Sequence, residues 1–241
     1  MVSYARCLCL GADVRRGTHQ KPFDGKIDYD YVMWIDSDQI FSFEQIQKLI
    51  SYDKDIVSGI YKTENGQNFA CVKDWDQNHY KKHGSFYFLQ QEDCVNHRGL
   101  MEVQYNGMGF MLIKKGVFEK VEYPWFRQMK KQVGDLEEYC SEDVAFCQLA
   151  REAGFKIFID PQMVVGHEKM RVLYYLVNFF LHHFKSYLPR TFVLSRCSVM
   201  FGAIKWVIHT APLSIASVAY VFIYNPVRSF KFTIFKTETG N

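Results

Sequence analysis

The sequence predicts an α/β domain followed by a hydrophobic C-terminal extension. Three features indicate this: a strand, a helix and a strand in succession over residues 31–61, short alternating segments over residues 68–104, and a change of composition after Lys169. Parallel strands need a crossover connection, so the first feature predicts a mostly parallel sheet flanked by helices. The second predicts an antiparallel β-ribbon. We therefore place the folded domain at residues 1–169 and a helical extension at residues 170–241.

The composition limits the classes of partner. Of the 241 residues, 48% are hydrophobic and 17% aromatic, which is enough for one sizeable core plus an appendage. The formal net charge is only +3, and no dense Lys/Arg run is interleaved with aromatic residues, so no nucleic-acid partner is expected. The seven cysteines are scattered without a Cys-x-x-Cys pair, which favours free thiols on the cytoplasmic, reducing side of a membrane. No secretory signal peptide is expected, because no long apolar region follows Met1.

The first elements are a helix and a loop. Residues 3–15 carry apolar side chains at helix-compatible spacing, which predicts a helix. Residues 17–30 are rich in Gly, Pro, Asp and Lys, which is typical of a loop. The first strand should therefore begin close to Tyr31.

The clearest strand ends in two carboxylates. Four apolar residues, Val32 to Ile35, run directly into Asp36-Ser-Asp38, and such a run is typical of a buried strand. Its end would hold Asp36 and Asp38 at the sheet edge, where open α/β folds bind ligands. Two fixed carboxylates favour a shared cation, and their oxygen atoms suit Mg²⁺ or Mn²⁺ bound together with phosphate. The alternative is that both aspartates only form the turn and cap the next helix.

The next elements continue the alternation. A helix is predicted at residues 43–51 and a second strand at residues 55–61, which with the first strand would form a βαβ unit. Short alternating segments then predict the strands of the antiparallel ribbon. These segments are residues 69–72, 85–89 and 100–104.

Two glycines precede another predicted strand. Gly107 and Gly109 come just before residues 111–113, where they would let a ligand approach the backbone closely or would simply form a tight bend. Residues 127–140 are polar and are expected to form a mobile loop.

An acidic pair opens the best-defined helix, which is predicted over residues 141–153. Glu142 and Asp143 lie in its first turn, where the helix dipole stabilises negative charge. Neighbouring helical side chains diverge by roughly 100°, so only one of the two can face a pocket.

The last predicted strand of the domain, at residues 156–160, leads towards His167. A histidine on a chain that leaves a strand is either a metal ligand or a surface residue. In the extension, residues 172–181 read as an amphipathic helix, and residues 206–224 contain no Asp, Glu, Lys or Arg. That length reaches the lower part of the bilayer-spanning range of about 17–25 residues, so residues 206–224 either contact a membrane or pack as a helix against the core or a partner.

The order of these motifs resembles the GT-A class of nucleotide-sugar-dependent glycosyltransferases, in particular small bacterial and viral family-two-like members. The resemblance covers roughly residues 4–169 and rests on the combined order. Its motifs are Asp36-Ser-Asp38, Gly107-Met-Gly109, Ser141-Glu-Asp143 and Asp160-Pro followed by Val-Gly-His167. It implies a Rossmann-like sheet and transfer of a hexosyl or deoxyhexosyl group from a nucleotide sugar to a hydroxyl of a glycan or glycoconjugate.

The resemblance also implies a metal site. Asp38, with help from Asp36, would match the Asp-x-Asp element that holds Mn²⁺ or Mg²⁺ on the donor diphosphate. His167 would match the histidine that completes the metal shell in many such enzymes. A divalent ion is suited to this place because it neutralises the charge that develops on the diphosphate leaving group.

The remaining motifs would supply the base and the pocket. Asp143, with Glu142 as the alternate, would match the general base, since the acceptor hydroxyl needs a carboxylate within hydrogen-bond reach. Gly107 and Gly109 would match the loop that lines the donor sugar and acceptor pocket.

One departure from the family keeps two other functions open. The family's nucleoside-binding βα unit is normally longer than the 35 residues that precede Asp36, so part of it is absent here or the nucleoside pocket is built another way. A truncated, non-catalytic membrane-associated interaction module would fit the short N-terminal part. A nucleotidyltransferase of related α/β architecture would also use metal-bound carboxylates. Such an enzyme should show a Gly-rich phosphate loop early in the chain, and the sequence shows none.

Overall fold

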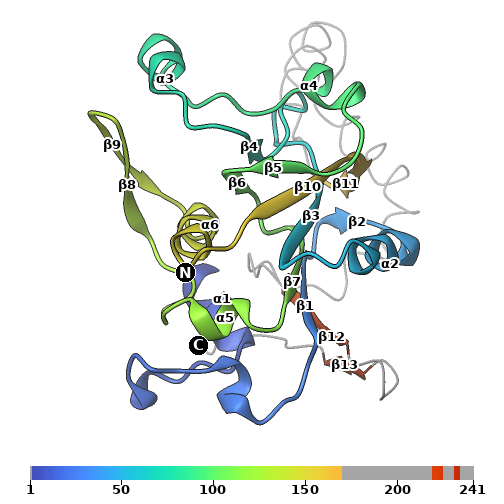
Figure 1. Ribbon diagram of the computed structural model, residues 1–241, viewed down its shortest axis with the longest axis vertical. Coiled ribbons are helices and arrows are strands. Elements are labelled where there is room, and N and C mark those ends of the chain that lie inside the picture. The colour runs from blue at the N-terminus through green and yellow to red at the C-terminus, as the bar shows by residue number, and fades with distance from the viewer. Residues whose placement is uncertain (1, 170–218, 225–230, 234–241) are drawn as a thin grey trace, which may run out of the picture. The chain divides into compact units, whose positions relative to one another are not determined.

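The computed structural model of the protein describes residues 2–169, 219–224 and 231–233, and its centre is a seven-stranded sheet (Figure 1). The strands follow the spatial order β13-β12-β1-β7-β3-β10-β5. Their bounds are β1 (Tyr31–Asp36), β3 (Ile56–Ile60), β5 (Met101–Val103), β7 (Phe110–Lys114), β10 (Ile157–Val164), β12 (Ala219–Tyr224) and β13 (Lys231–Thr233). Helices flank this sheet, so the predicted α/β class is confirmed.

The predicted mostly parallel sheet is wrong, because most neighbouring strands are antiparallel. β1 is antiparallel to both β12 and β7, and β7 is antiparallel to β3. Within the described sheet the parallel pair is β3 with β10. β1 and β3 run in the same direction but are separated by β7, which comes from later in the chain. The βαβ unit therefore exists without direct pairing of its two strands.

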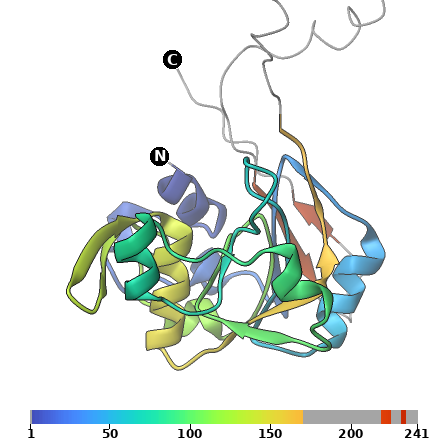
Figure 2. The ribbon, with the colours of Figure 1, turned by 90° about the horizontal axis from the view of Figure 1, so that it is seen from above.

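β1 lies deep in the sheet and contributes to a core on each face. Residues Val32 to Ile35 are at most 1% exposed. Val32 and Trp34 belong to the core on one face, and Met33 and Ile35 belong to the core on the other, as the alternation of a strand requires. Figure 2 shows α2 on one side of the sheet and α6 on the other.

The two longest helices, α2 and α6, lie where the sequence periodicity predicts them. α2 begins behind Ser42, whose backbone N–H donates to Gln45 Oε1 at 2.8 Å. α1 ends earlier than residue 15, because Gly11 adopts a φ of 74° where a helix cannot continue. The helices are α1 (Val2–Cys9), α2 (Phe43–Ser51), α3 (Gln77–His83), α4 (Gln91–Val95), α5 (Val117–Lys120) and α6 (Glu142–Glu152), with short 3₁₀ turns at Val14–Arg16 and Pro22–Gly25.

The antiparallel ribbon predicted over residues 68–104 is also wrong. Residues 85–89 form no strand, and residues 101–103 join the central sheet as β5. The small strands β4 (Cys71–Val72) and β6 (Tyr105–Asn106) pair with each other instead. Aromatic residues in the 85–89 segment pack on the core from a loop, which gives an alternating pattern without strand hydrogen bonds.

A β-hairpin occupies the region predicted to be a mobile loop. β8 (Met129–Val133) pairs with β9 (Leu136–Cys140) along its whole length, and Gly134 lies in the turn with a φ of 61°. Both faces of this hairpin carry Lys, Gln and Glu, so no apolar alternation marks it in the sequence. A second short pair, β2 (Gln39–Ile40) with β11 (Gly166–His167), lies beyond the end of β1.

The described part of the C-terminal extension consists of strands. Residues 219–224 form β12 beside β1, so the helix expected over residues 206–224 is wrong at its end. Residues 206–218 and 172–181 lie outside the described residues. Among the helices that the structure describes, none is long and apolar enough to cross a bilayer. The six cysteines among the described residues, at positions 7, 9, 71, 94, 140 and 147, are free thiols.

A buried carboxylate ties β10 to α2. Asp160 is 4% exposed at its side chain, and it accepts hydrogen bonds from the Tyr52 hydroxyl at 2.8 Å and the Gln162 backbone N–H at 2.9 Å. The ammonium of Lys48 lies 2.8 Å from it. Burial works to raise the pKa of Asp160, but the contacts with Lys48 and Tyr52 outweigh it and lower that pKa.

We expect Asp160→Asn to lower the free energy of unfolding by about 1–3 kcal/mol at pH 7. A depressed folded-state pKa stabilises fully above the unfolded value near 4, and this stabilisation is lost as the pH falls through the folded value. Urea unfolding of both proteins at pH 7 and in acid should therefore show a difference that shrinks in acid. Glu122→Gln, at an exposed position, is the control, and an equal loss in that variant would contradict the assignment.

Candidate functional site

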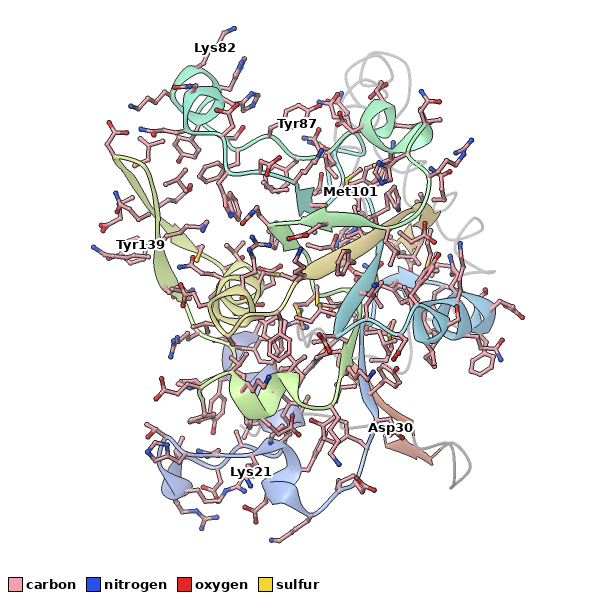
Figure 3. The ribbon with its side chains drawn as sticks, viewed as in Figure 1. Lys21, Asp30, Lys82, Tyr87, Met101 and Tyr139 are labelled. Atoms are coloured by element: carbon pink, nitrogen blue, oxygen red, sulfur yellow. The ribbon has the colours of Figure 1, made fainter. Side chains whose placement is uncertain are left out.

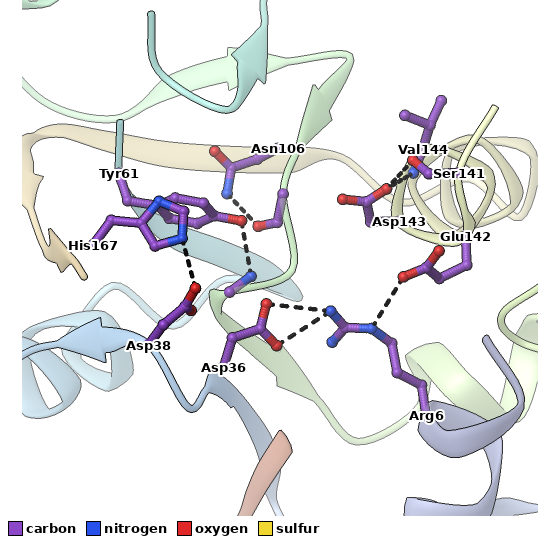
Figure 4. A network of polar contacts seen from close by, with 12 residues as sticks. Arg6, Asp36, Asp38, Tyr61, Asn106, Ser141, Glu142, Asp143, Val144 and His167 are labelled. Atoms are coloured by element: carbon purple, nitrogen blue, oxygen red, sulfur yellow. Dashed lines mark hydrogen bonds and ion pairs between the residues drawn. The ribbon is translucent and has the colours of Figure 1, made fainter. Parts of the chain in front are cut away.

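Polar side chains from four segments lie together beyond the end of β1 (Figure 4). The segments are the turn that follows β1, the strand β11, the helix α1 and the start of α6. Asp36 is the last residue of β1, and its backbone N–H donates to the Gly109 carbonyl at 2.9 Å. Asp38 follows in the turn, and the Glu168 backbone N–H donates to its carbonyl at 2.8 Å. The sheet and these two bonds fix the backbone that carries both carboxylates.

Asp38 and His167 face each other. His167 Nε2 lies 3.1 Å from Asp38 Oδ2, and His167 Nδ1 lies 2.6 Å from the Lys62 carbonyl oxygen. A carbonyl oxygen only accepts hydrogen bonds, so Nδ1 carries the proton and donates it. In neutral His167 the Nε2 lone pair therefore faces a carboxylate oxygen. Two acceptors at this distance need a proton or a metal ion between them.

Two features fix the orientation of the His167 ring. Its edge packs against Tyr61, with ring centroids 5.0 Å apart and ring planes at 72°. The pairing of β11 with β2 places His167 opposite Gln39 in the register, directly beside Asp38 in the sequence. The imidazole is thus positioned by backbone pairing, by a carbonyl and by an aromatic ring.

Asp36 has a different partner, the guanidinium of Arg6 on α1. Arg6 Nη2 lies 3.2 and 3.4 Å from the two carboxylate oxygens of Asp36, and Arg6 Nε lies 3.5 Å from Glu142 Oε1. Arg6 is only 5% exposed, and its guanidinium carbon lies 5.5 Å from the ring centroid of Trp34. Burial works to lower the pKa of Arg6, but nearby carboxylates, Asp36 foremost, raise it overall. Arg6 is therefore a buried cation between two acidic segments.

Asp143, the neighbour of Glu142 at the start of α6, is held by hydrogen bonds and not by Arg6. Its Oδ2 accepts from the Tyr105 hydroxyl at 3.0 Å, and its Oδ1 accepts from the Val144 backbone N–H at 2.9 Å and from the Ser141 hydroxyl. Burial, and then the charge of Asp143, raises the pKa of Tyr105, which keeps the phenol protonated as a donor. The adjacent acids thus turn to different partners, Glu142 to Arg6 and Asp143 to Tyr105.

Gly107 and Gly109 make room for Tyr61. A Cβ on Gly107 would overlap the Tyr61 hydroxyl, and a Cβ on Gly109 would lie 2.9 Å from Tyr61 Cζ. The Tyr61 hydroxyl also accepts a hydrogen bond from the Gly109 backbone N–H at 3.1 Å. Both glycines are buried, so they shape the floor of the site by close packing of backbone on a tyrosine.

The predicted ligands Asp36, Asp38 and His167 are not gathered into one set. Among the described residues, no group of three or more His, Cys, Asp or Glu side chains has metal-binding spacing. Asp38 and His167 alone fit two adjacent ligands of one ion. Two ligand atoms bound at about 2.1–2.2 Å and at right angles lie about 3.0–3.1 Å apart, against the 3.1 Å between them here.

Sequence reasoning missed Arg6, Tyr61 and Tyr105. Each lies in an element that the sequence marks only as structural, a helix or the end of a strand. A single arginine in an apolar helix face is visible in the sequence, but its contact with Asp36, 30 residues away, depends on the fold. The two tyrosines look like ordinary core residues until their hydroxyl partners are known.

Comparison with known proteins yields little similarity. No family model and no curated protein matches the chain. A solved structure that is similar to it is A197 from STIV, with 17% sequence identity and a TM-score of 0.38. That match covers 71% of this chain and 78% of A197. A likeness at this level carries no argument about the fold or the function.

We expect Arg6→Met to lower the free energy of unfolding by about 1–3 kcal/mol, because it leaves Asp36 and Glu142 close together without a cation. Urea unfolding of Arg6→Met, Asp36→Asn and the double variant measures the coupling between the two side chains. The control is Arg15→Met, whose side chain is 86% exposed, so that solvent screens its ion pair with Asp13 and little change in stability is expected. Additive effects in the double variant would show that the Arg6–Asp36 contact is not stabilising.

Proposed function

We propose that this protein is a metal-dependent glycosyltransferase, which moves a sugar from a nucleotide sugar to an acceptor hydroxyl. The observation that carries the proposal is the pairing of Asp38 with His167 at the end of β1. The Lys62 carbonyl fixes the proton on Nδ1, and metal-binding histidines are commonly oriented by such a bond to their second nitrogen. The order of motifs in the sequence supports the reaction class.

Asp38 and His167 would hold Mn²⁺ or Mg²⁺, with the diphosphate of the donor completing the shell. The bound ion would supply charge neutralisation for the diphosphate leaving group. Asp36 is held by Arg6, so we assign it the role of fixing the turn that presents Asp38. This division gives the two aspartates of the motif separate tasks.

Asp143 is the base that this geometry favours over Glu142. A carboxylate has about four lone-pair positions, and donors from this chain use three of those on Asp143, so one remains for an acceptor hydroxyl. The N-terminus of α6 also stabilises its negative charge. Glu142, in contrast, is paired with the cation of Arg6.

The reaction then balances as a single displacement. The acceptor oxygen forms a bond to the anomeric carbon, and the bond from that carbon to the diphosphate oxygen breaks. The hydroxyl proton passes to Asp143, and the electron pair of the broken bond leaves with the nucleoside diphosphate.

An assay with Mn²⁺ and a panel of nucleotide sugars, with and without saccharide acceptors, tests the proposal. Release of nucleoside diphosphate together with a glycosylated product is the expected result. Pyrophosphate release from a nucleoside triphosphate and a sugar phosphate would point to a nucleotidyltransferase. A folded protein without either activity would point to an interaction module.

We expect His167→Ala and Asp38→Asn to weaken Mn²⁺ binding by at least about tenfold, because each removes a ligand. Calorimetric titration of Mn²⁺ in the presence of a nucleoside diphosphate measures this. His83→Ala, at an exposed position on α3, is the matched control and should bind as the wild type does. Unchanged affinity in both site variants would mean that a proton, and not a metal ion, joins Asp38 to His167.

We expect Asp143→Asn to keep donor binding and to lose transfer by a factor of about 10²–10⁴, the usual contribution of a general base. Initial rates of product formation at saturating donor, compared with those of Glu142→Gln, measure the effect. An inactive Glu142→Gln beside a fully active Asp143→Asn would reverse the roles. Full activity in both would leave the acidic pair as a helix cap.

A further inference from the structure

An aromatic cavity adjoins the N-terminus of α6. Its volume is about 270 Å³, and it lies among α3, the segment that follows α3, the β8–β9 hairpin and the start of α6. Figure 1 shows α3 and the hairpin as two arms on the same side of α6. The aromatic residues that line the cavity are Trp75, Tyr80, Phe86, Phe88, Tyr105 and Tyr139.

Contacts between the rings hold this wall in place. Phe86 packs edge-on against Trp75, with centroids 4.8 Å apart, and its centroid lies 4.6 Å from that of Tyr80. Tyr105 stacks against Trp75 from the other side, with centroids 6.3 Å apart and planes at 29°. The rings of Trp75, Tyr80, Phe86 and Tyr105 thus support one another, yet Trp75, Tyr80 and Phe86 remain partly exposed.

The rim of the cavity is polar. The ammonium of Lys131 lies 4.6 Å from the ring centroid of Trp75, and Glu138 and Ser141 lie at the same cavity. Lys131 is partly buried, and this burial lowers the pKa of its ammonium. Lys131 Nζ also donates to Gln148 Oε1 at 3.2 Å, and the Ser141 hydroxyl donates to Asp143, so polar groups and aromatic rings lie side by side at this cavity. The cavity therefore suits a ligand with both an apolar face and hydroxyl groups.

Asp143 does not line the cavity itself but is hydrogen-bonded to residues that do. Three cavity residues, Tyr105, Ser141 and Val144, each donate a hydrogen bond to the Asp143 carboxylate. A ligand in the cavity would thus lie next to the group assigned above as the base. The Asp38–His167 pair is on the opposite side of Asp36 and Arg6 in Figure 4.

We propose that this cavity is the acceptor subsite and that it takes a neutral saccharide ring. The C–H face of the sugar would stack on Trp75 and Phe86, and its hydroxyls would bond to the rim and to Asp143. The volume falls just below the range of about 300–1,000 Å³ for drug-sized ligands, which fits one small ring and not a lipid chain. The role as acceptor subsite rests on the proposed function, whereas the binding of a free saccharide does not.

Direct binding tests the cavity without any donor or metal. Saturation-transfer NMR with methyl α-glucoside, methyl β-galactoside and N-acetylglucosamine should detect binding of at least one of them. Trp75→Ala and Phe86→Ala should weaken that binding by about tenfold, while Trp75→Phe, which keeps a ring, should retain most of it. Tyr87→Ala is the control, because Tyr87 lies in the same segment but is absent from the cavity wall (Figure 3).

A second variant keeps the test valid if the alanine variants fail to fold. Ser85→Trp, at an exposed position on the cavity wall, fills the space without removing a packed side chain and should abolish binding. Absence of binding for all three sugars, or binding that Ser85→Trp and Trp75→Ala leave unchanged, would overturn the proposal. Binding of uridine or guanosine that these variants abolish would also overturn it and would assign the cavity to a nucleoside. A saccharide that binds without any transfer activity would leave the subsite standing and reject the glycosyltransferase function.

Discussion

One buried cation allows the acidic segments of this protein to lie together. Arg6 enters from α1 and contacts Asp36 at the end of β1 and Glu142 at the start of α6. Without it, the carboxylates of Asp36 and Glu142 would lie close together with no cation between them, which is unfavourable for two like charges. In Figure 4 the site has two halves: Asp38 and His167 lie on one side of Asp36, and Glu142 and Asp143 at the start of α6 lie on the other. The chemistry we propose needs both halves on one sheet edge, so it depends on α1.

The sequence predicts well those features that depend on local pattern. The apolar run from Val32 to Ile35 forms the buried strand β1, and α6 begins at Glu142, as expected from the acidic first turn. The placement of Asp38 at the end of a strand follows from the same run. These outcomes need only the neighbours of each residue in the chain, which is the information that periodicity contains.

Features that depend on pairing between distant segments cannot be predicted from local pattern. The insertion of β7 between β1 and β3 makes the sheet mostly antiparallel, yet no local pattern in Phe110–Lys114 differs from that of a parallel strand. The hairpin at Met129–Cys140 could not be predicted for another reason, since most of its side chains are polar and its few apolar residues do not alternate regularly. Arg6 at Asp36 and Tyr105 at Asp143 likewise come from distant segments, so these two contacts could not be predicted from the sequence.

The position of β12 has a consequence for the chain as a whole. β12 covers one side of β1 in full register, from Tyr31 opposite Tyr224 to Asp36 opposite Ala219. If it detached, β1 would become an edge strand with a row of unpaired backbone groups, and its side chains are among the most apolar in the protein. Such an edge is a template for pairing with another copy of the chain. By pairing with β1, residues 219–224 therefore prevent this strand from pairing with another copy of the chain.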